Sequence, residues 1–357
     1  MLNAKVKILP FQIIQISDGV ILKRSATEIS VKGPGAVEAL QAVLALADSG
    51  ATVENICAAF STVARPTVEQ LLNKLIEKRL LVIAEGDTHL EENTETALDV
   101  FYWNFGSTGL QVANVLNAKK IAILGVNYVS RQLVNVLNAT GVQNFTIVDV
   151  PILRNLRLFN EEGRLENGWQ SNASGPVDYL EWSSKTEPAH VNCIIATSDF
   201  GGHKVLRDWN RMCVENKVHY LPVSLCDGIG WLGPLVLPGD TPCFECFWMR
   251  LQSTTDDRQI RQAIDDVRFA GQPFTGFHPS MASILGDIAA MELTKFYGGV
   301  LPMTNLGTAF EVNLIATSIK KHRVLKAPRC AVCSSLNSQS TISLKKSVFN
   351  DFVSNPT

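Results

Sequence analysis

"KKIAILGVNYVSRQLVNVLNATG" spans residues 119–141 and carries the strongest structural signal in the chain. It begins with a short apolar run typical of a buried strand, turns at Gly125, and continues with the apolar period of a helix. A second apolar run, "FTIVDV", follows at 145–150. A strand, a helix and a second strand in this order predict a parallel sheet with helices on its faces.

The same alternation continues toward the C-terminus. Residues 190–199 and 219–225 have the composition of buried strands, and a helical pattern at 203–217 separates them. A β-rich stretch at 230–239, a long helical pattern at 278–299 and a strand-like segment at 308–325 complete the series. We therefore expect a Rossmann-like α/β domain over residues 98–340, followed by a C-terminal tail at 341–357.

A separate small module precedes this domain. Residues 11–33 form short β-branched runs divided by "SDG" and "RSAT", and three helical patterns follow at 35–50, 52–60 and 66–82. Three strands and three helices within residues 1–84 predict a winged helix-turn-helix. The polar, acidic stretch at 85–97 reads as a linker.

Winged helices commonly bind DNA, and the charges argue against that use. The last helix of the module mixes Glu69 and Glu77 with Lys74 and Lys78, and the whole chain has 32 basic and 34 acidic residues. A peptide that adds a strand beside the third strand is the alternative. Its predicted contacts are Thr27, Ile29 and Val31 on the strand, and Leu71, Lys74, Leu75 and Lys78 on the helix.

Composition sets the remaining bounds. The 357 residues are 46% hydrophobic, and the mean hydropathy is +0.10. No apolar run is long enough to predict a membrane span, and the N-terminus lacks the pattern of a secretory signal. We expect a cytoplasmic protein with no nucleic-acid or membrane partner.

Four of the eight cysteines form two CxxC pairs, Cys243/Cys246 and Cys330/Cys333. In a reducing compartment this pattern favours a metal over disulfides. Four thiolates complete a tetrahedral zinc shell and leave no open position for catalysis. The sequence therefore predicts a structural zinc site that ties the C-terminal segment to the rest of its domain.

These motifs carry a family resemblance. The strand–turn–helix opening, Asp149, "TSDF" with Asp199, "GPLVLPGDTPCFEC" and the closing "CAVC" resemble, in order, the E1-like superfamily, which includes adenylating enzymes for ubiquitin-like proteins and for the microcin C peptide. The N-terminal module resembles the leader-peptide recognition element of ribosomal peptide pathways. "WLGPLVLPGDTPCFECFWMRL" makes the chain most similar to the ocin-ThiF-like partner proteins of azole and azoline cyclodehydratases.

The resemblance implies a site for ATP and Mg²⁺, and the sequence departs from it. Active members have a GxGGxG turn whose backbone approaches the phosphates, whereas Gly125 here is followed by "VNYVS". Asp149 stands at the expected ribose position and Asp199 at the magnesium position. The family's NxxR-type arginine corresponds to Arg157, with Asn155 nearby, at a compressed spacing. Each aspartate has a second interpretation, that it caps the helix following its own strand.

Two functions follow from the resemblance. In the first, the chain is a noncatalytic maturation subunit that captures the leader of a precursor peptide and presents its core to a YcaO-type cyclodehydratase for ATP-dependent dehydration. In the second, it is a stand-alone enzyme that activates precursor carboxylates with ATP, as the microcin C or pantocin type does. Whether the chain is itself an enzyme stays open, and the resemblance also implies a homodimer.

Overall fold

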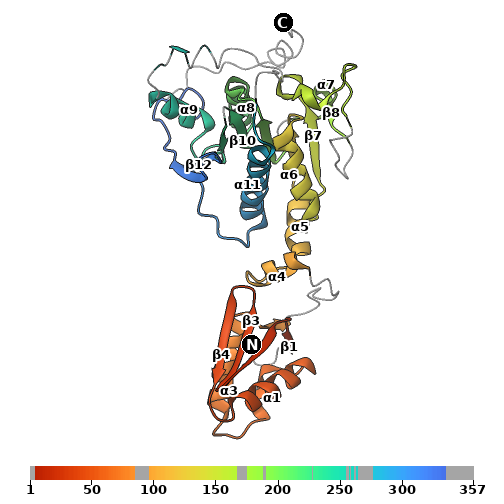
Figure 1. Cartoon of the computed structure of the whole chain (residues 1–357), viewed down its shortest axis with the longest axis vertical. Helices are drawn as coiled ribbons and strands as arrows, with labels where there is room; N and C mark the ends of the chain where they lie inside the picture. Colours follow the sequence, from red (N-terminus) through yellow and green to blue (C-terminus); the bar gives the residue numbers. More distant parts are fainter. Residues whose placement is uncertain are drawn as a thin grey trace. The chain divides into compact units, whose positions relative to one another are not determined.

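The computed structural model describes residues 5–84, 96–166, 175–187, 190–226, 228–254, 257, 259–260, 263 and 276–334. They divide into two compact units, residues 1–111 and 112–357 (Figure 1). Most of the predicted linker and all of the predicted C-terminal tail lie outside the described residues. None of the described helices is long and apolar enough to cross a membrane.

The first unit joins a three-stranded antiparallel sheet to three helices. The sheet has the order β2-β3-β4, and its strands are β2 (Gln12–Ile16), β3 (Gly19–Arg24) and β4 (Thr27–Lys32). The helices are α1 (Ala36–Asp48), α2 (Val53–Ala58) and α3 (Arg65–Glu77). Every second residue of β3 and β4 is buried, and this alternation places Leu22, Ile29 and Val31 in the core of the unit. Leu72 and Leu75 of α3 belong to the same core.

The first unit contains three further elements, β1, β5 and α4. β1 (Lys5–Ile8) pairs antiparallel with β5 (Leu81–Ala84), which joins the two ends of the predicted N-terminal module. The short helix α4 (Ala97–Trp103) also belongs to this unit, so the unit extends past the predicted boundary at residue 84. Thr96 caps α4 by accepting a hydrogen bond from the amide of Asp99 at 3.2 Å.

The second unit contains an eight-stranded mixed sheet with the order β13-β12-β11-β10-β9-β6-β7-β8. The neighbours from β10 through β8 are parallel, and the pairs β10-β11, β11-β12 and β12-β13 are antiparallel. The strands are β6 (Ile121–Leu124), β7 (Phe145–Asp149), β8 (Val177–Asp178), β9 (Cys193–Ser198), β10 (His219–Cys226), β11 (Ile229–Leu232), β12 (Thr308–Asn313) and β13 (Ser318–Arg323). The predicted α/β class is confirmed.

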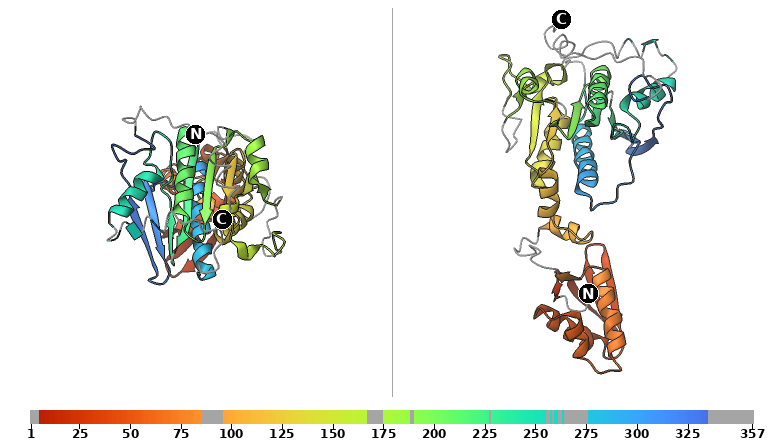
Figure 2. Two further views of the ribbon diagram at one scale, coloured as in Figure 1. Left: turned by 90° about the horizontal axis from the view of Figure 1, so that it is seen from above. Right: turned by 180° about the vertical axis from the view of Figure 1, so that it is seen from behind.

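The helices that pack on the strands of this sheet are α6 (Tyr128–Ala139), α7 (Tyr179–Lys185), α8 (His203–Glu215) and α11 (Pro279–Gly298) (Figure 2). α9 (Phe244–Ser253) packs against α8. α5 (Gly109–Asn117) begins in the first unit and ends in the second. α6 and α11 pack closely because Gly286 lacks a side chain; a Cβ there would stand 2.7 Å from the amide nitrogen of Leu133.

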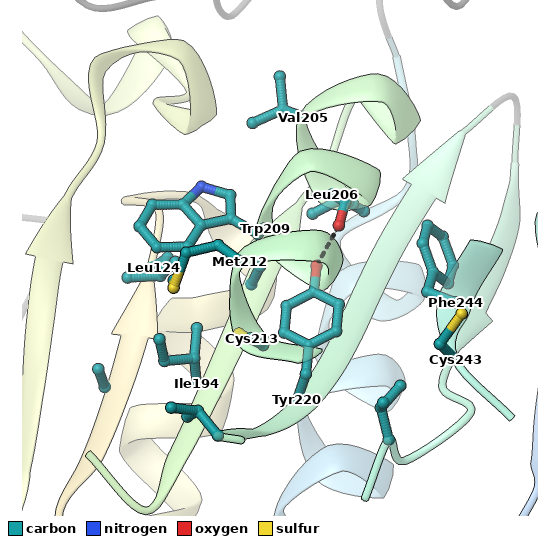
Figure 3. Packing of buried hydrophobic residues seen from close by; sticks show 14 of the residues in the cluster. Leu124, Ile194, Val205, Leu206, Trp209, Met212, Cys213, Tyr220, Cys243 and Phe244 are labelled. Atoms are coloured by element: carbon teal, nitrogen blue, oxygen red, sulfur yellow. Dashed lines mark hydrogen bonds between the residues drawn. The ribbon is translucent and has the colours of Figure 1, made fainter. Parts of the chain in front are cut away.

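The core that supports the candidate site lies under α8. Leu124 and Ile194 come from neighbouring parallel strands and pack among Leu206, Trp209 and other α8 side chains (Figure 3). The hydroxyl of Tyr220 donates to the carbonyl of Leu206 at 2.8 Å, which fixes the helix to the sheet. This core holds the carboxyl ends of β6 and β9 in place, and the loops that follow those ends form the site described next.

Candidate functional site

Three predicted nucleotide-site residues come together at the carboxyl ends of neighbouring parallel strands. β6 pairs in parallel with β7 on one side and β9 on the other, so their carboxyl ends are adjacent. Gly125 follows β6, Asp149 ends β7 and Asp199 follows β9. Open parallel sheets bind ligands at the carboxyl ends of their strands, so the topology puts these residues where the sequence predicted a site.

A buried asparagine fills the turn after β6. Gly125 has φ +98°, and a Cβ on it would stand 2.8 Å from both the Asn127 side-chain nitrogen and the Thr197 carbonyl oxygen. The Asn127 amide is fully buried and donates to the Leu153 carbonyl at 3.2 Å and the Thr197 carbonyl at 3.0 Å. Its oxygen accepts from the Ser130 amide at 3.0 Å and caps α6. The glycine therefore leaves room for Asn127.

The predicted ribose carboxylate has an arginine partner. Arg154 donates to both oxygens of Asp149, from Nε at 2.6 Å and from Nη2 at 2.7 Å. This is a bidentate ion pair, and the same guanidinium lies 4.8 Å from the ring centroid of Phe159. Arg154 is thus the bidentate partner of Asp149, while the predicted Arg157 has its backbone amide bound to the Asn155 side chain at 3.0 Å.

Asp199 occupies the N-terminus of α6. Its Oδ2 accepts from the Tyr128 amide at 3.0 Å and from the Asn155 side chain at 2.9 Å. Helix N-termini stabilise anions, and here the bound anion is the chain's own carboxylate. Among the described residues, Oδ1 is buried without a hydrogen-bond partner.

Burial raises the pKa of Asp199, while the bonds from Tyr128 and Asn155 and the charge of Arg157 act in the opposite direction. The interpretation of Asp199 as a cap of the following helix is wrong. That helix, α8, has Gly202 at its N-cap and no side-chain cap, whereas Asp199 caps α6 from a distant part of the chain. Asn155 connects the loop after β7 to the loop after β9, because its side chain donates to Asp199.

The geometry disfavours a triphosphate at this turn. The backbone amide at the start of α6 is used by Asp199, the space beside Gly125 contains Asn127, and Asp149 is neutralised by Arg154. Binding of ATP would have to break these contacts. Among the described residues of this site, the unpaired oxygen of Asp199 suits a cation.

The four predicted cysteines form one cluster. Their sulfur atoms all lie within 4.8 Å of one another, although Cys243 and Cys246 are far in sequence from Cys330 and Cys333. Measured separations are 3.8 Å for Cys243–Cys246, 3.6 Å for Cys243–Cys330 and 3.4 Å for Cys246–Cys333. Sulfurs about 2.3 Å from a zinc ion have tetrahedral edges of about 3.8 Å, so the cluster fits a metal.

Backbone amides face two of the four sulfur atoms. Hydrogen bonds among the four thiols lower the pKa of Cys246 and of Cys330, and they raise the pKa of Cys243 and of Cys333. The Cys246 sulfur also accepts the backbone amide of Ala327 at 3.4 Å, and the Cys330 sulfur accepts that of Val332 at 3.5 Å. Backbone donors of this kind stabilise negatively charged sulfur.

The predicted peptide contacts divide into buried and exposed groups. Ile29, Val31 and Leu75 point into the core, so their side chains support the module. Thr27 bonds the Asn104 side chain at 3.1 Å, Leu71 is half-buried, and Lys74 and Lys78 are exposed. Among the described strands, β4 pairs with β3 alone, which leaves its other edge available.

Sequence reasoning missed Asn127 and Arg154. An Asn-x-x-Ser pattern begins at Asn127, and this pattern is a helix-capping signal. It could have predicted the role of Asn127 at the turn after Gly125. Arg154 follows Asp149 by five residues in a loop that contains short 3₁₀ turns at Pro151–Leu153 and Leu156–Leu158. Such a loop has no regular spacing from which contact between the two side chains could be predicted.

Comparisons with known proteins identify the fold. No protein-family model and no curated protein matches the sequence. The crystal structure of Escherichia coli MccB is similar with a TM-score of 0.62 at 15% identity, over 92% of this chain and 97% of that one. MccB with ATP gives 0.62 at 16% identity, over 92% and 99%. The heterocyclase TruD gives 0.59 at 19% identity, over 93% of this chain and 43% of TruD. At these identities the likeness is one of fold, and it extends over both units.

Proposed function

We propose that the chain is a maturation protein for a ribosomally made peptide, which it binds and presents to a separate modifying enzyme. The fold likeness to MccB and to a heterocyclase supports the class of process, since MccB has been solved with its peptide MccA and the heterocyclase with substrate. One observation favours the noncatalytic role: Asp149 and Asp199, the two carboxylates expected to serve a nucleotide, are engaged by Arg154 and by the start of α6.

The first unit is the proposed peptide-binding element, in the manner of a winged-helix recognition domain. Among the described strands β4 pairs on one side only, and an extended peptide can pair with its other side through backbone hydrogen bonds. Lys74 and Lys78 on α3 are exposed and offer positive charge to an acidic leader. The peptide would be specified by exposed side chains such as these, while Ile29, Val31 and Leu75 hold the module together.

The four-cysteine cluster is the proposed zinc site. Cys243 and Cys246 lie at the start of α9, and Cys330 and Cys333 follow β13. Four thiolates would fill the coordination shell, so the ion would join these two segments and take no part in bond making. This role is structural.

The proposal assigns ring formation to a partner. A YcaO-type enzyme would use ATP to activate a backbone amide, and the present chain would position the peptide for it. A second copy of the chain is proposed from the family resemblance alone, and a cytoplasmic location is proposed from the sequence pattern. The alternative, an enzyme that activates carboxylates with ATP and Mg²⁺, is favoured by the unpaired oxygen of Asp199 and by the likeness to MccB with ATP.

One experiment separates these functions. The purified chain is incubated with Mg-ATP and the precursor peptide encoded beside its gene, and the peptide mass is measured with and without a co-encoded YcaO enzyme. We expect binding of the peptide by the chain alone and loss of water with the partner only. Loss of water, or attachment of a nucleotide, with the chain alone would establish the enzyme instead.

The peptide-binding element is tested in the same full-length chain. Lys74→Glu combined with Lys78→Glu reverses the charge of two exposed lysines at the C-terminal end of α3 and should weaken peptide binding at least fivefold. Lys185→Glu changes an exposed lysine on α7 of the other unit; it is the matched control and should leave the affinity unchanged. Equal affinities for all three proteins would remove α3 from the proposed site.

A further inference from the structure

The first unit contains a cavity that the proposed function does not use. Its volume is about 470 Å³, which suits a small organic molecule or a few side chains. Its wall includes Leu9, Ile76, Leu81 and Trp103, which are apolar, and the charged residues Glu77 and Arg79. No residue of β4 belongs to the wall, so the cavity is distinct from the proposed peptide edge.

A buried arginine lies behind this wall. Arg24 ends β3, is 4% exposed, and donates from Nη1 to the carbonyl oxygen of Arg79 at 2.8 Å. Its guanidinium carbon lies 5.8 Å from the ring centroid of Trp103. Nε and Nη2 are buried and have no hydrogen-bond partner among the described residues. Buried donors on a charged group are costly when unpaired, which indicates that an acceptor is missing.

Arg79 adds a second positive charge. It has φ +55°, and its guanidinium lies against Gly106, where any Cβ would overlap it. Burial, together with the charge of Arg79, lowers the pKa of Arg24. Within the described part of the chain neither arginine has an ion-pair partner, and the one wall carboxylate, Glu77, lies 3.8 Å from Lys78. The cavity wall thus combines apolar surface with the guanidinium group of Arg79, and the buried guanidinium group of Arg24 lies beside Trp103 of that wall.

We propose that this cavity binds an organic carboxylate, with the apolar part beside Trp103 and the carboxylate hydrogen-bonded to Arg24 and Arg79. Guanidinium groups bind carboxylates through two parallel hydrogen bonds, and Arg24 has two free donors for this purpose. The exposed side chain of Arg79 turns away from Gly106 to admit the ligand. The carboxylate belongs either to an acidic residue of a peptide or to a free acid.

Two matched pairs of probes test whether binding requires a negative charge on the ligand. 3-Phenylpropionate is compared with 3-phenylpropanamide, and acetyl-Leu-Glu-Leu-amide with acetyl-Leu-Gln-Leu-amide. The full-length chain is observed through its tryptophan indole NMR signals, and Trp103→Phe identifies the relevant one. We expect at least one acid of the two pairs to shift the Trp103 signal and to bind at least tenfold more tightly than its amide. Tighter binding of the tripeptide than of the free acid would assign a peptide as the source, and the reverse order a small molecule.

Variants show whether the two arginines are responsible. Arg79→Gln changes an exposed side chain and should weaken acid binding at least fivefold, as should Arg24→Gln. Glu77→Gln removes the opposing carboxylate and should strengthen it, whereas the exposed Glu69→Gln, outside the wall, should have no effect. Equal binding of acids and amides, no binding of any probe, or unchanged affinity in Arg79→Gln would overturn the proposal.

The chain's own linker is the competing occupant. It carries Glu85, Asp87, Glu91, Glu92 and Glu95. Replacing these five residues with their amides should leave acid binding unchanged. Binding that appears only after this replacement would assign the arginines to the linker and would also overturn the proposal.

Discussion

Arg154 binds both carboxylate oxygens of Asp149, at 2.6 and 2.7 Å, in the position where a sheet of this type would bind a ribose. The pair is partly buried, with side-chain exposures of 26% for Arg154 and 13% for Asp149. The carboxylate of Asp149 is thus oriented, and its charge neutralised, by an arginine from the loop that follows its own strand. This relationship is the physical basis for proposing that the chain kept the fold and gave up nucleotide chemistry.

Removing the arginine should destabilise the second unit. Arg154→Ala leaves Asp149 without its charge partner and removes the contact with Phe159, so we expect the free energy of unfolding to fall by about 1–3 kcal/mol. Denaturant unfolding measures it. Arg164→Ala is the control, because the Arg164–Glu162 pair is 80% and 67% exposed and should contribute less than about 1 kcal/mol. Equal effects would mean that the Asp149 pair is not a structural contact.

The sequence predicted the parts that depend on local pattern. Alternating apolar runs predicted the parallel strands, and the spacing of the two CxxC pairs predicted the cysteine cluster, because four thiolates are needed to complete one shell. Thr52 caps α2, as its position before an apolar period predicts, by accepting from the Asn55 amide at 3.2 Å.

Contacts between distant segments were not predictable in this way. Asp199 caps α6, whose first residue precedes it by 71 positions, and no local pattern records that pairing. The β1-β5 ladder likewise joins residues at opposite ends of the first module. Thr67 and Gln70 have the spacing of a capping box before an apolar run, which predicts a helix start at Thr67. This prediction is wrong, since α3 begins at Arg65 with Ala64 at its N-cap and no side-chain cap.

The turn after β6 should not tolerate a side chain at Gly125. Gly125 and Gly239 have nearly the same backbone angle, φ +98° and φ +96°, but a Cβ meets nothing within 4 Å at Gly239. Gly239→Ala therefore reports backbone strain alone, about 1 kcal/mol. Gly125→Ala adds the overlap with Asn127 and the Thr197 carbonyl and should cost at least about 2 kcal/mol more. Equal losses, measured by denaturant unfolding, would show that the turn has room.

Asp199 should make stability depend on pH. Burial raises its folded pKa above the usual 3.8, so between these two values the folded chain binds more protons than the unfolded chain. The free energy of unfolding should therefore fall as pH rises through the folded pKa. Asp199→Asn should remove this component, and its stability relative to the wild type should rise with pH. The exposed Asp240→Asn is the control. A stability of Asp199→Asn that falls relative to the wild type as pH rises would contradict the account.

The cysteine cluster should bind one zinc ion per chain. Cys330→Ser removes one of four ligands and should reduce the zinc content measured by elemental analysis and lower thermal stability. Cys57→Ser, in the other unit and outside the cluster, should retain the metal. A wild-type chain that is folded and metal-free after purification in zinc-containing buffer would refute the assignment.

Calorimetric titration of Mg-ATP into the full-length chain, with its precursor peptide already bound, tests the central claim most directly. The contacts of Asn127, Arg154 and Asp199 predict no saturable binding at millimolar nucleotide, while the peptide itself remains bound. Saturable binding of Mg-ATP that is lost in Asp199→Asn would contradict the account and establish a working nucleotide site.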